Sequence, residues 1–411
     1  MPEFFNVLAP DVALRTLLER LQTRVGVEVV PTPQALGRIT AETVLAPENL
    51  PAFPRSTMDG YAVRASDTFG ASESLPAYLE VIGEVRMGQA PDLRLGTAQA
   101  AVAYTGGMLA EAADAVVMVE NTQTVDATSI EVFRPVAPGE NVVQVGEDVR
   151  AGETIVPAGC TLRPQDIGGL VALGVTQVKV RCRPRVAIVS TGDEIVAPDT
   201  VPGPGQIRDI NTYTIAALVE QAGGVPVPLG VVRDDYEAQR QAAVQGLAQA
   251  DMLVFSAGSS VSSRDMTVQV LHSLGPPGVL VHGIAHRPGK PTILALIGNQ
   301  PAFGLPGNPV SAMIVFRLLV RPTLYALTGC TRLPQPRTVR ARLSKNIPSV
   351  AGREDHVQVR LSSADGVLHA EPVFGKSNLI YTLIRADGVV VVPLDQGGLY
   401  AGAEVPVQLY D

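Results

Sequence analysis

The chain has 411 residues, of which 46% are hydrophobic and 18% charged. That length suggests roughly two to four domains with buried cores, and the balance excludes a disordered protein. The formal net charge of −8 argues against a general nucleic-acid-binding protein, which ordinarily carries a basic face.

The N-terminal sequence MPEFFNVLAP lacks the basic stretch and apolar core of a signal peptide. No apolar run approaches the roughly 18 residues that cross a bilayer. Three cysteines lie far apart without a CxxC pair, as free thiols of a reducing compartment do. The five histidines show no metal-ligand spacing such as HExxH. These features predict a cytoplasmic protein without a membrane segment.

The N-terminal part predicts two helices and then a domain boundary. Apolar positions at helical spacing predict a helix over residues 9–25 with Asp11 as its N-cap, and a short second helix is expected at 33–36. The proline-rich stretch LAPENLPAFP (45–54) follows and predicts the boundary.

Short apolar runs with frequent breakers follow, which predicts a small all-β domain over 47–145. Residues 144–174 then predict one or two strands and a helix beginning near Pro164. Because the chain enters this region from 1–46 and leaves it through 146–180, we expect these two segments to pack as one extended linking domain. The β domain would be an insertion in it.

Residues 181–328 predict an α/β cassette. Its expected strands lie at 186–189, where the run stops at Ser190, and at 225–232, 252–256, 279–284, 292–297 and from 302, and a helix is expected to begin at Asn211 as its cap. Several strands end in carboxylates or in a Gly/Ser turn. Open α/β sheets bind ligands at such strand ends, so this arrangement predicts a site for an anionic ligand associated with a metal.

Strands at regular spacing return from about residue 334, which predicts a C-terminal β-barrel domain over 329–411. The fold class expected for the whole chain is therefore multidomain α/β plus β: a three-layer α/β cassette, an inserted small β domain and a C-terminal barrel, in an elongated molecule.

Charged residues at the strand ends of the cassette suggest specific roles. Asp193 and Glu194 are adjacent on an extended backbone and cannot point the same way, so one of them is expected to be structural. Asp234 lies three residues before Glu237, as in a capping box, so a helix cap and a ligand remain equal alternatives for it. Arg287 and Lys290 offer charge-assisted donors to an oxyanion.

Five motifs occur in one order along nearly the whole chain: PAFPRSTMDGYAVR (51–64), STGDE (190–194), a Gly-Ser-Ser turn followed by Arg264-Asp265-x-Thr267, RPGKP (287–291) and LPGNPVSA (305–312). Together they resemble the molybdopterin molybdenumtransferase family, which includes the C-terminal domain of gephyrin. The resemblance implies insertion of molybdenum into adenylylated molybdopterin, with molybdate as the second substrate, Mg²⁺ as cofactor and AMP released, so that molybdenum cofactor forms.

The resemblance also implies the site residues. The catalytic ones are Asp59, Thr105, Glu194, Asp234, Asp265 and Lys290, and three of these, Glu194, Asp234 and Asp265, are the implied Mg²⁺ ligands. The implied ligand-binding residues are Ser190, Thr191, Gly192, Gly258, Ser259, Ser260, Arg287, Pro306, Gly307, Asn308, Arg353 and Ser377. Asp148 matches an acidic position of the family, and a plain loop residue is the equal alternative.

The chain departs from the family pattern at four positions. Ala257, Ser259 and Ser262 replace residues of a more glycine-rich turn, and Gly283 stands where many relatives carry a lysine, whose charge the neighbouring His282 is one candidate to supply. The Ser-Ser turn is closer to the related adenylyltransferases, so molybdopterin adenylylation is the alternative activity. A gephyrin-like scaffold is the alternative from another class.

The resemblance further implies a homodimer in which the β domain of one chain faces the cassette of the other, so that the active sites are shared. Two sequence features favour the same arrangement. Asp59 and Thr105 belong to the inserted domain, and the connection around 170–185 encodes no obvious reversal that would fold it back. A molybdopterin adenylyltransferase is a further expected partner.

Overall fold

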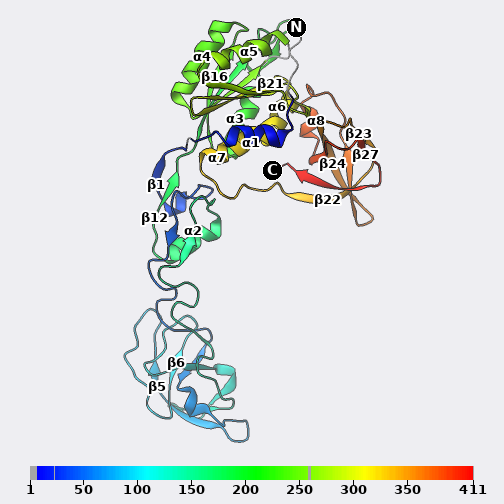
Figure 1. Cartoon of the computed structure of the whole chain (residues 1–411). Coiled ribbons are helices and arrows are strands. Elements are labelled where there is room, and N and C mark those ends of the chain that lie inside the picture. Colours follow the sequence, from blue (N-terminus) through cyan, green and yellow to red (C-terminus); the bar gives the residue numbers. More distant parts are fainter. Residues whose placement is uncertain (1–6, 23, 258–260, 411) are drawn as a thin grey trace.

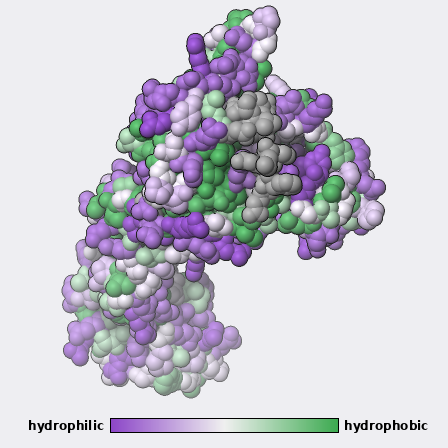
Figure 2. All heavy atoms as spheres, turned by 45° about the horizontal axis from the view of Figure 1, so that its top comes forward, coloured by the Kyte–Doolittle hydropathy of each residue, from purple (hydrophilic) through white to green (hydrophobic). Residues whose placement is uncertain are grey.

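The computed structural model describes residues 7–22, 24–257 and 261–410, with no side-chain description for 257 and 261–265. Figure 1 shows an elongated molecule: an α/β domain and a C-terminal β domain lie side by side, and a long arm leads from them to a separate β domain. Hydrophilic residues cover much of the face shown in Figure 2, the arm included. The predicted fold class is confirmed.

The arm begins below α1 (Pro10–Leu18). β1 (Val27–Pro31) pairs antiparallel with β12 (Gln177–Arg181), and β2 (Val44–Leu45) pairs with β11 (Thr154–Val156). α2 (Pro164–Ala172) packs Leu170 into a small core of its own with residues from both segments. The outgoing and returning segments therefore run side by side, and we keep 1–46 and 146–180 as the proposed extent of this linking part.

The predictions for the two N-terminal helices need correction. α1 ends at Leu18 instead of residue 25, because Leu21 and Val25 reach the cassette core from an irregular segment. Pro10, with its fixed φ, takes the first helical position, so Asp11 lies inside the helix and pairs with Arg15 at 3.2 Å instead of capping it. The second predicted helix is a single 3₁₀ turn, η1 (Thr32–Gln34).

The domain at the end of the arm is built on one mixed sheet in the order β7-β4-β6-β5-β9-β8. Its strands are β4 (Gly60–Val63), β5 (Ala77–Glu84), β6 (Gln99–Ala103), β7 (Ala115–Met118), β8 (Thr122–Thr124) and β9 (Ser129–Val132). The short strands β3 (Arg55–Ser56) and β10 (Val142–Val143) pair where the chain enters and leaves. Alternating apolar side chains such as Leu79, Ile130 and Val132 form the core.

The cassette sheet has the order β16-β13-β17-β21-β20-β18. β16 (Val225–Val232), β13 (Arg185–Thr191), β17 (Met252–Ala257) and β21 (Gln300–Pro306) are mutually parallel, and β20 (Ile293–Ile297) and β18 (Pro277–His282) continue it antiparallel. Two short strands, β14 (Ile195–Val196) and β15 (Ile207–Arg208), pair outside the sheet.

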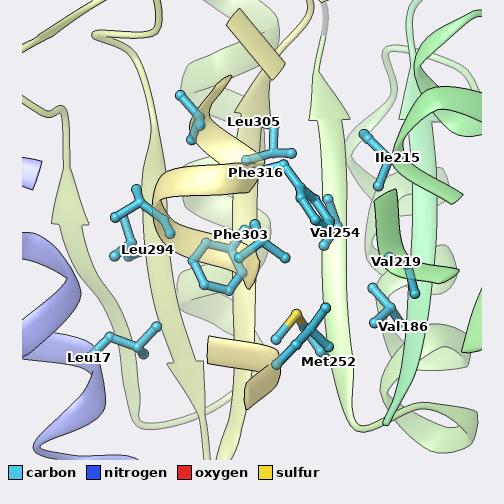
Figure 3. Close-up of a cluster of buried hydrophobic side chains, with 14 of the residues drawn as sticks. Leu17, Val186, Ile215, Val219, Met252, Val254, Leu294, Phe303, Leu305 and Phe316 are labelled. Atoms are coloured by element: carbon cyan, nitrogen blue, oxygen red, sulfur yellow. The ribbon is translucent and has the colours of Figure 1, made fainter. Parts of the chain in front are cut away.

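Helices cover both faces of this sheet, which makes three layers. On one face, α1, α3 (Asn211–Gln221) and the helical stretch from residue 309 bury side chains such as Leu17, Ile215 and Phe316 against the strands, as Figure 3 shows. On the other face, α4 (Tyr236–Gln249) and α5 (Val261–Ser273) form a second core with Ala243 and Leu271. The first core is the larger of the two and contains the fully buried Phe303 and Phe316, whereas Phe255 belongs to the second.

One helical stretch among the described residues, Pro309–Leu327, is long and apolar enough to cross a membrane by length and composition. It consists of α6 (Pro309–Val315), a π-helical turn η4 (Phe316–Val320) and α7 (Arg321–Leu327). Its side chains Val315, Leu319 and Leu324 belong to the main cassette core. Packing against the sheet therefore accounts for its apolar character.

The C-terminal domain is a closed barrel of β22 (Thr338–Leu343), β24 (Glu354–Ala364), β25 (Val367–Pro372), β26 (Gly388–Val392) and β28 (Glu404–Leu409). The pairing of β24 with β26 closes it around Val359, Val390 and Val407. The strands β23 (Ile347–Pro348) and β27 (Gly398–Leu399) pair beside it, and α8 (Tyr381–Ile384) packs towards the cassette. β19 (His286–Arg287) of the cassette pairs with β24 and joins the two domains.

Candidate functional site

The carboxyl ends of four parallel strands meet at one edge of the cassette sheet. The register places Thr191 of β13 beside Val232 of β16, Ser190 beside Ser256 of β17, and Ala257 beside Pro306 of β21. Because ligands of open α/β sheets bind outside such strand ends, this edge, which we call the strand-end site, is the first part of the candidate site.

Ser190 and Thr191 are fully buried at this edge. The Ser190 hydroxyl donates to Asp209 Oδ1 at 3.1 Å and lies 2.9 Å from the Thr212 hydroxyl. The backbone N–H of Thr212 donates to the same Asp209 oxygen at 3.1 Å. Asp209, itself only 6% exposed, therefore fixes the end of β13 against the start of α3.

Asn211 does not cap α3 as predicted. It is the first residue of the helix, and Asp209 accepts the capping hydrogen bond from Thr212 instead. Asn211 Nδ2 donates to Ser256 Oγ at 2.7 Å and to the Gly307 carbonyl at 2.8 Å. The side chain thus ties the ends of β17 and β21 together, and its Oδ1 is buried without a hydrogen-bond partner among the described residues.

Asp234 is not a helix cap. The N-cap of α4 is Asp235, whose side chain accepts from Ala238 N–H at 2.9 Å. Both residues are aspartates, and only the backbone conformation decides which one caps. Asp234 Oδ1 is instead buried and without a partner among the described residues. The cap alternative is wrong for Asp234, and the ligand alternative stands as a proposal.

Two carboxylates, of Asp193 and Glu194, act on the carboxylate of Asp234 at the strand-end site. Burial raises the pKa of Asp234, and the negative charges of Asp193 and Glu194 raise it further. Glu194 folds back over the backbone, since a Cβ added at Gly192 would lie 2.7 Å from Glu194 Oε2. Gly192, with φ of +149°, makes this close approach possible. Such mutual repulsion is the condition that a bound cation relieves.

The residues present fit a divalent cation of the Mg²⁺ kind. Their donors are oxygens, as Mg²⁺ prefers, and the unpartnered Asp234 oxygen is available to it. The ligand atoms of the three carboxylates do not all lie within 4.8 Å of one another. Among the described residues, one group of three potential ligands meets that distance, and it lies elsewhere. Mg²⁺ usually keeps several waters and is held by one or two carboxylates together with substrate phosphates, so an open arrangement suits it.

The second part of the candidate site is a pocket of about 830 Å³ between the cassette and the barrel. Its lining includes the four cationic side chains of Arg287, Lys290, Arg353 and Lys376, and the polar side chains of Asn308, Ser311 and Ser377. We call it the cationic pocket. Asn308 Nδ2 donates to Ser377 Oγ at 2.8 Å, which fixes a loop of the barrel domain against the start of α6.

A buried carboxylate orients two of the cations. Arg353 donates twice to Asp355, at 2.8 and 3.3 Å, and Arg287 lies 3.7 Å from the same carboxylate. Asp355 is 2% exposed. Because two guanidinium groups share one carboxylate, the pocket retains a net positive charge. Arginine and lysine bind oxyanions through charge-assisted hydrogen bonds, so this charge favours an oxyanion as the ligand.

The cationic pocket and the strand-end site adjoin through Pro306, Gly307 and Asn308. Pro306 and Asn308 line the pocket, and the Gly307 carbonyl accepts from Asn211 of the strand-end site. The predicted residues Pro306, Asn308, Arg287, Lys290, Arg353 and Ser377 therefore gather in one place with Ser190, Thr191 and Gly192 beside them.

Neither Gly283 nor His282 lines the cationic pocket. Gly283 has φ of +102°, in the left-handed region that favours glycine, and its N–H donates to Thr292 O. Lys376, which the sequence did not single out, lines the pocket instead. The lining of this pocket does not support the suggestion that His282 supplies the missing charge, and that suggestion stays a prediction.

Asp59 and Thr105 belong to the inserted β domain, as predicted, which lies at the far end of the arm in Figure 1, and the two residues contact each other there. Asp59 Oδ1 accepts from the Thr105 backbone N–H at 2.7 Å and from its hydroxyl at 3.0 Å. Both residues are exposed. Asp148 is an exposed residue of the connection to the arm, where its N–H donates to Leu50 O; its role stays open.

Several predicted residues lie outside the described part of the structure. These are Gly258, Ser259 and Ser260, together with the side chains of Ala257, Ser262 and Asp265. The backbone at 265 belongs to α5, which begins at Val261 directly after the undescribed turn. The implied roles of Asp265 and of this turn remain predictions.

Sequence reasoning missed Asp209, Asn211 as a bridge, Asp355 and Lys376. Asp209 and Asn211 carried a detectable signal, an Asp-x-Asn sequence at the start of a helix. It also missed a pair of buried histidines, His286 and His356, whose rings meet edge to face with centroids 4.6 Å apart. These two come from different domains, so no local spacing could reveal them.

Comparison with known families covers nearly the whole chain. Residues 8–174 match the MoeA N-terminal region (domain I and II), residues 187–326 a probable molybdopterin binding domain, and residues 340–410 the MoeA C-terminal region (domain IV). These three matches follow the order of arm, cassette and barrel in the structure.

Curated relatives and a solved structure agree with these matches. A molybdopterin molybdenumtransferase of Nostoc is 34% identical, over 95% of this chain and 90% of its own length. One of Haemophilus influenzae is 31% identical, over 98% and 99%. The crystal structure of a molybdopterin biosynthesis MoeA protein from Pyrococcus horikoshii is 38% identical with a TM-score of 0.83, over 98% of this chain and 99% of that one.

Proposed function

Because the chain belongs to the molybdopterin molybdenumtransferase (MoeA) family, we propose that it inserts molybdenum into adenylylated molybdopterin, with molybdate as the second substrate and AMP as a product. The observation that carries this proposal is the adjacency of a cationic pocket and a carboxylate-bearing strand-end site. The cationic pocket suits an oxyanion, and the carboxylates of the strand-end site suit a phosphate-bound cation.

The cationic pocket is the proposed molybdate site. Lys290 and Arg287 approach from the cassette, and Arg353 and Lys376 from the barrel domain. Molybdate and an adenylylated pterin are both anions, and fixed positive charges that screen their repulsion lower the barrier to bringing them together. Asp355 pairs with both Arg353 and Arg287 and so restrains their guanidinium groups at the pocket.

The strand-end site is the proposed site of the adenylyl end of the pterin substrate. Ser190 and Thr191 form the end of β13 and Gly192 follows directly, and the Thr191 hydroxyl has no hydrogen-bond partner among the described residues. Gly307 and Asn308, which the family resemblance also implies as ligand-binding residues, lie directly before α6. Glu194 and Asp234 would hold Mg²⁺ there, with Asp265 as the third implied ligand. Mg²⁺ bound to the phosphates would neutralise charge that develops when the phosphoanhydride is cleaved.

The working site is proposed to contain two chains. Asp59 and Thr105 belong to the β domain, which Figure 1 shows at the end of the arm, remote from the cassette of its own chain. A two-fold dimer would bring the β domain of one chain to the cassette of the other and complete both sites at once. We place the protein in the cytoplasm, with a molybdopterin adenylyltransferase as the partner that supplies the substrate.

The adenylylation alternative is less well supported. Relatives named for molybdenum transfer align with the whole chain, including the arm and the barrel domain. In vitro reconstitution tests the proposal: purified protein, adenylylated molybdopterin, molybdate and Mg²⁺ should yield AMP and a product that activates a cofactor-free molybdenum enzyme. Molybdate-independent formation of adenylylated pterin from ATP would instead support the alternative.

A further inference from the structure

Two histidines and a glutamate meet at the joint between the cassette and the barrel. One ligand atom from each of His286, Glu354 and His356 lies within 4.8 Å of the others, and no other three potential ligands of this kind converge so closely among the described residues. His286 and His356 are 2% and 7% exposed. The group is separate from the carboxylates of the strand-end site.

His286 has the hydrogen bonding of a metal-binding imidazole. Its Nδ1 lies 2.6 Å from the Pro288 carbonyl oxygen, so Nδ1 must carry the proton and donate it. Nε2 then carries a lone pair, and it is buried without a hydrogen-bond partner among the described residues. A backbone carbonyl that accepts from one ring nitrogen fixes the tautomer that offers the other nitrogen to a metal.

The hydrogen bond to Pro288 holds the imidazole with its proton on Nδ1, and a metal binds an imidazole through the nitrogen that carries no proton. A lone pair buried without a partner costs free energy unless something binds it. The unpartnered Nε2 of His286 thus points to a ligand independently of the convergence of the three side chains.

His356 and Glu354 complete the donor set. His356 Nε2 lies 2.7 Å from Glu354 Oε1, a hydrogen bond in which the ring nitrogen donates to the carboxylate. A Zn²⁺ ion would displace that proton and bind both atoms at the ordinary Zn–N and Zn–O lengths of about 2.0–2.2 Å. Glu354 pairs with His286 in the register of β19 and β24, so the short strand pair presents both domains' ligands at one point. Two imidazoles and one carboxylate form a donor set that Zn²⁺ favours over Mg²⁺.

We propose that His286, Glu354 and His356 form a binding site for a divalent transition metal of the Zn²⁺ class that fastens the barrel domain to the cassette. Three protein ligands leave a fourth position open. Both histidines also line the cationic pocket, so a water or an oxyanion in that pocket can fill the fourth position. The site is independent of the Mg²⁺ proposed for the strand-end site and does not rest on the proposed function.

Direct metal binding tests this proposal on the full-length, chelator-treated protein. Calorimetric titration with Zn²⁺, in the presence of excess Mg²⁺, should show one tight equivalent per chain. Co²⁺ should give the intense visible absorption of a four-coordinate site. Cys160, Cys182 and Cys330 are free thiols, so the titrations should be repeated with the thiols alkylated, which must leave the tight equivalent unchanged.

Glu354→Gln is the sharpest variant, because glutamine keeps the size and a hydrogen-bond acceptor for His356 but is a poor metal ligand. It and His356→Gln should weaken Zn²⁺ binding roughly 10–100-fold or more, since even loss of an outer-shell partner has that effect. His272→Gln, which changes an exposed histidine of α5, is the matched control and should bind as wild type does.

Amide hydrogen exchange supplies a readout besides affinity. Zn²⁺ should slow exchange in β19 and the first residues of β24 in the wild type and leave Glu354→Gln unchanged. The proposal is overturned if the folded wild type takes up no tight equivalent. It is equally overturned if the Glu354 and His356 variants bind Zn²⁺ as the wild type does, which would leave the histidines as a buried pair without a metal.

Discussion

Asp59 accepts two hydrogen bonds from Thr105, one from the backbone N–H at 2.7 Å and one from the hydroxyl at 3.0 Å. Both bonds favour the charged carboxylate, and together they lower the pKa of Asp59, the backbone bond contributing more. The contact joins residues from two loops of the inserted domain and holds an exposed carboxylate in one orientation. A fixed, ionised group on an exposed surface is what a site completed by a second chain requires.

Thr105→Val tests this relationship. Valine keeps the backbone donor and removes the hydroxyl, so the pKa of Asp59 should rise only part of the way towards its ordinary value of about 3.9. Asp59 stays ionised at neutral pH in both proteins, and any loss of turnover there reflects orientation instead of charge. Titration of the labelled carboxyl carbon by NMR measures the shift. Thr105→Ser, which retains a hydroxyl, should titrate like wild type; an equal shift in both variants would contradict the assignment.

Lys290→Ala should weaken the use of molybdate far more than binding of the pterin substrate. The loss of a hydrogen bond to a charged group costs about 1.5–3 kcal/mol, so the apparent affinity for molybdate should fall roughly tenfold to a hundredfold. The molybdate dependence of the reconstitution assay measures this. Lys345→Ala removes a lysine that pairs with Glu371 outside the cationic pocket and is the control. An unchanged molybdate dependence in Lys290→Ala would exclude the proposed role.

The strand ends of the cassette could be predicted from sequence, because β-branched runs that stop at Gly or Asp leave few alternatives for where a buried strand ends. The caps could not be predicted. Asp234 and Asp235 share one side-chain chemistry, and the helix begins after the second, where Asp235 has an extended backbone and accepts from the Ala238 N–H as an N-cap. At the start of α3 the same ambiguity arises: Asp209 accepts the hydrogen bond from the Thr212 N–H, and Asn211, which was predicted to do so, donates to Ser256 instead.

The cationic pocket was only partly predictable. RPGKP marked Arg287 and Lys290 within a single loop, but Asp355 and Lys376 come from a domain whose docking depends on β19 and β24. The meeting of His286 with His356 depends on the same pairing. Contacts between domains are non-local, and neither hydrophobic periodicity nor turn chemistry within one segment specifies them.

Asp234→Asn should raise the thermal stability of the Mg²⁺-free protein at neutral pH. The pKa of Asp234 is higher in the folded protein than in the unfolded chain. Its contribution to the stability of the fold is therefore fully present at pH below the unfolded-state pKa, and it is lost as pH rises through the folded-state pKa. Asparagine removes the repulsion from Asp193 and Glu194. The gain in melting temperature should therefore shrink as pH falls towards about 3.9, and a gain that is independent of pH would contradict this cause.

Mg²⁺ should separate the roles of the two neighbouring aspartates. Wild-type protein should gain melting temperature on addition of Mg²⁺, and Asp234→Asn should gain little and lose Mg²⁺-dependent turnover. Asp235→Ala removes the cap of α4 and should lower the free energy of unfolding by about 1 kcal/mol while keeping the Mg²⁺ response. If Asp234→Asn turns over normally, Asp234 is not a ligand.

The proposed sharing of each active site between two chains makes a quantitative prediction for mixtures of inactive variants. Asp59→Ala damages the β-domain half of each site, and Glu194→Ala the cassette half, so each homodimer should be inactive. Random pairing on co-expression gives mixed dimers as about half of the population, and each mixed dimer has one site with both halves intact. About a quarter of wild-type activity should return if the two sites work independently.

The matched control combines Glu194→Ala with Asp234→Ala, both in the cassette, and should recover nothing because every site of its mixed dimers keeps one defect. Differently tagged chains, captured in sequence, verify that mixed dimers form. Should the Asp59 and Glu194 mixture remain as inactive as its control despite such dimers, Asp59 does not complete a site on a second chain.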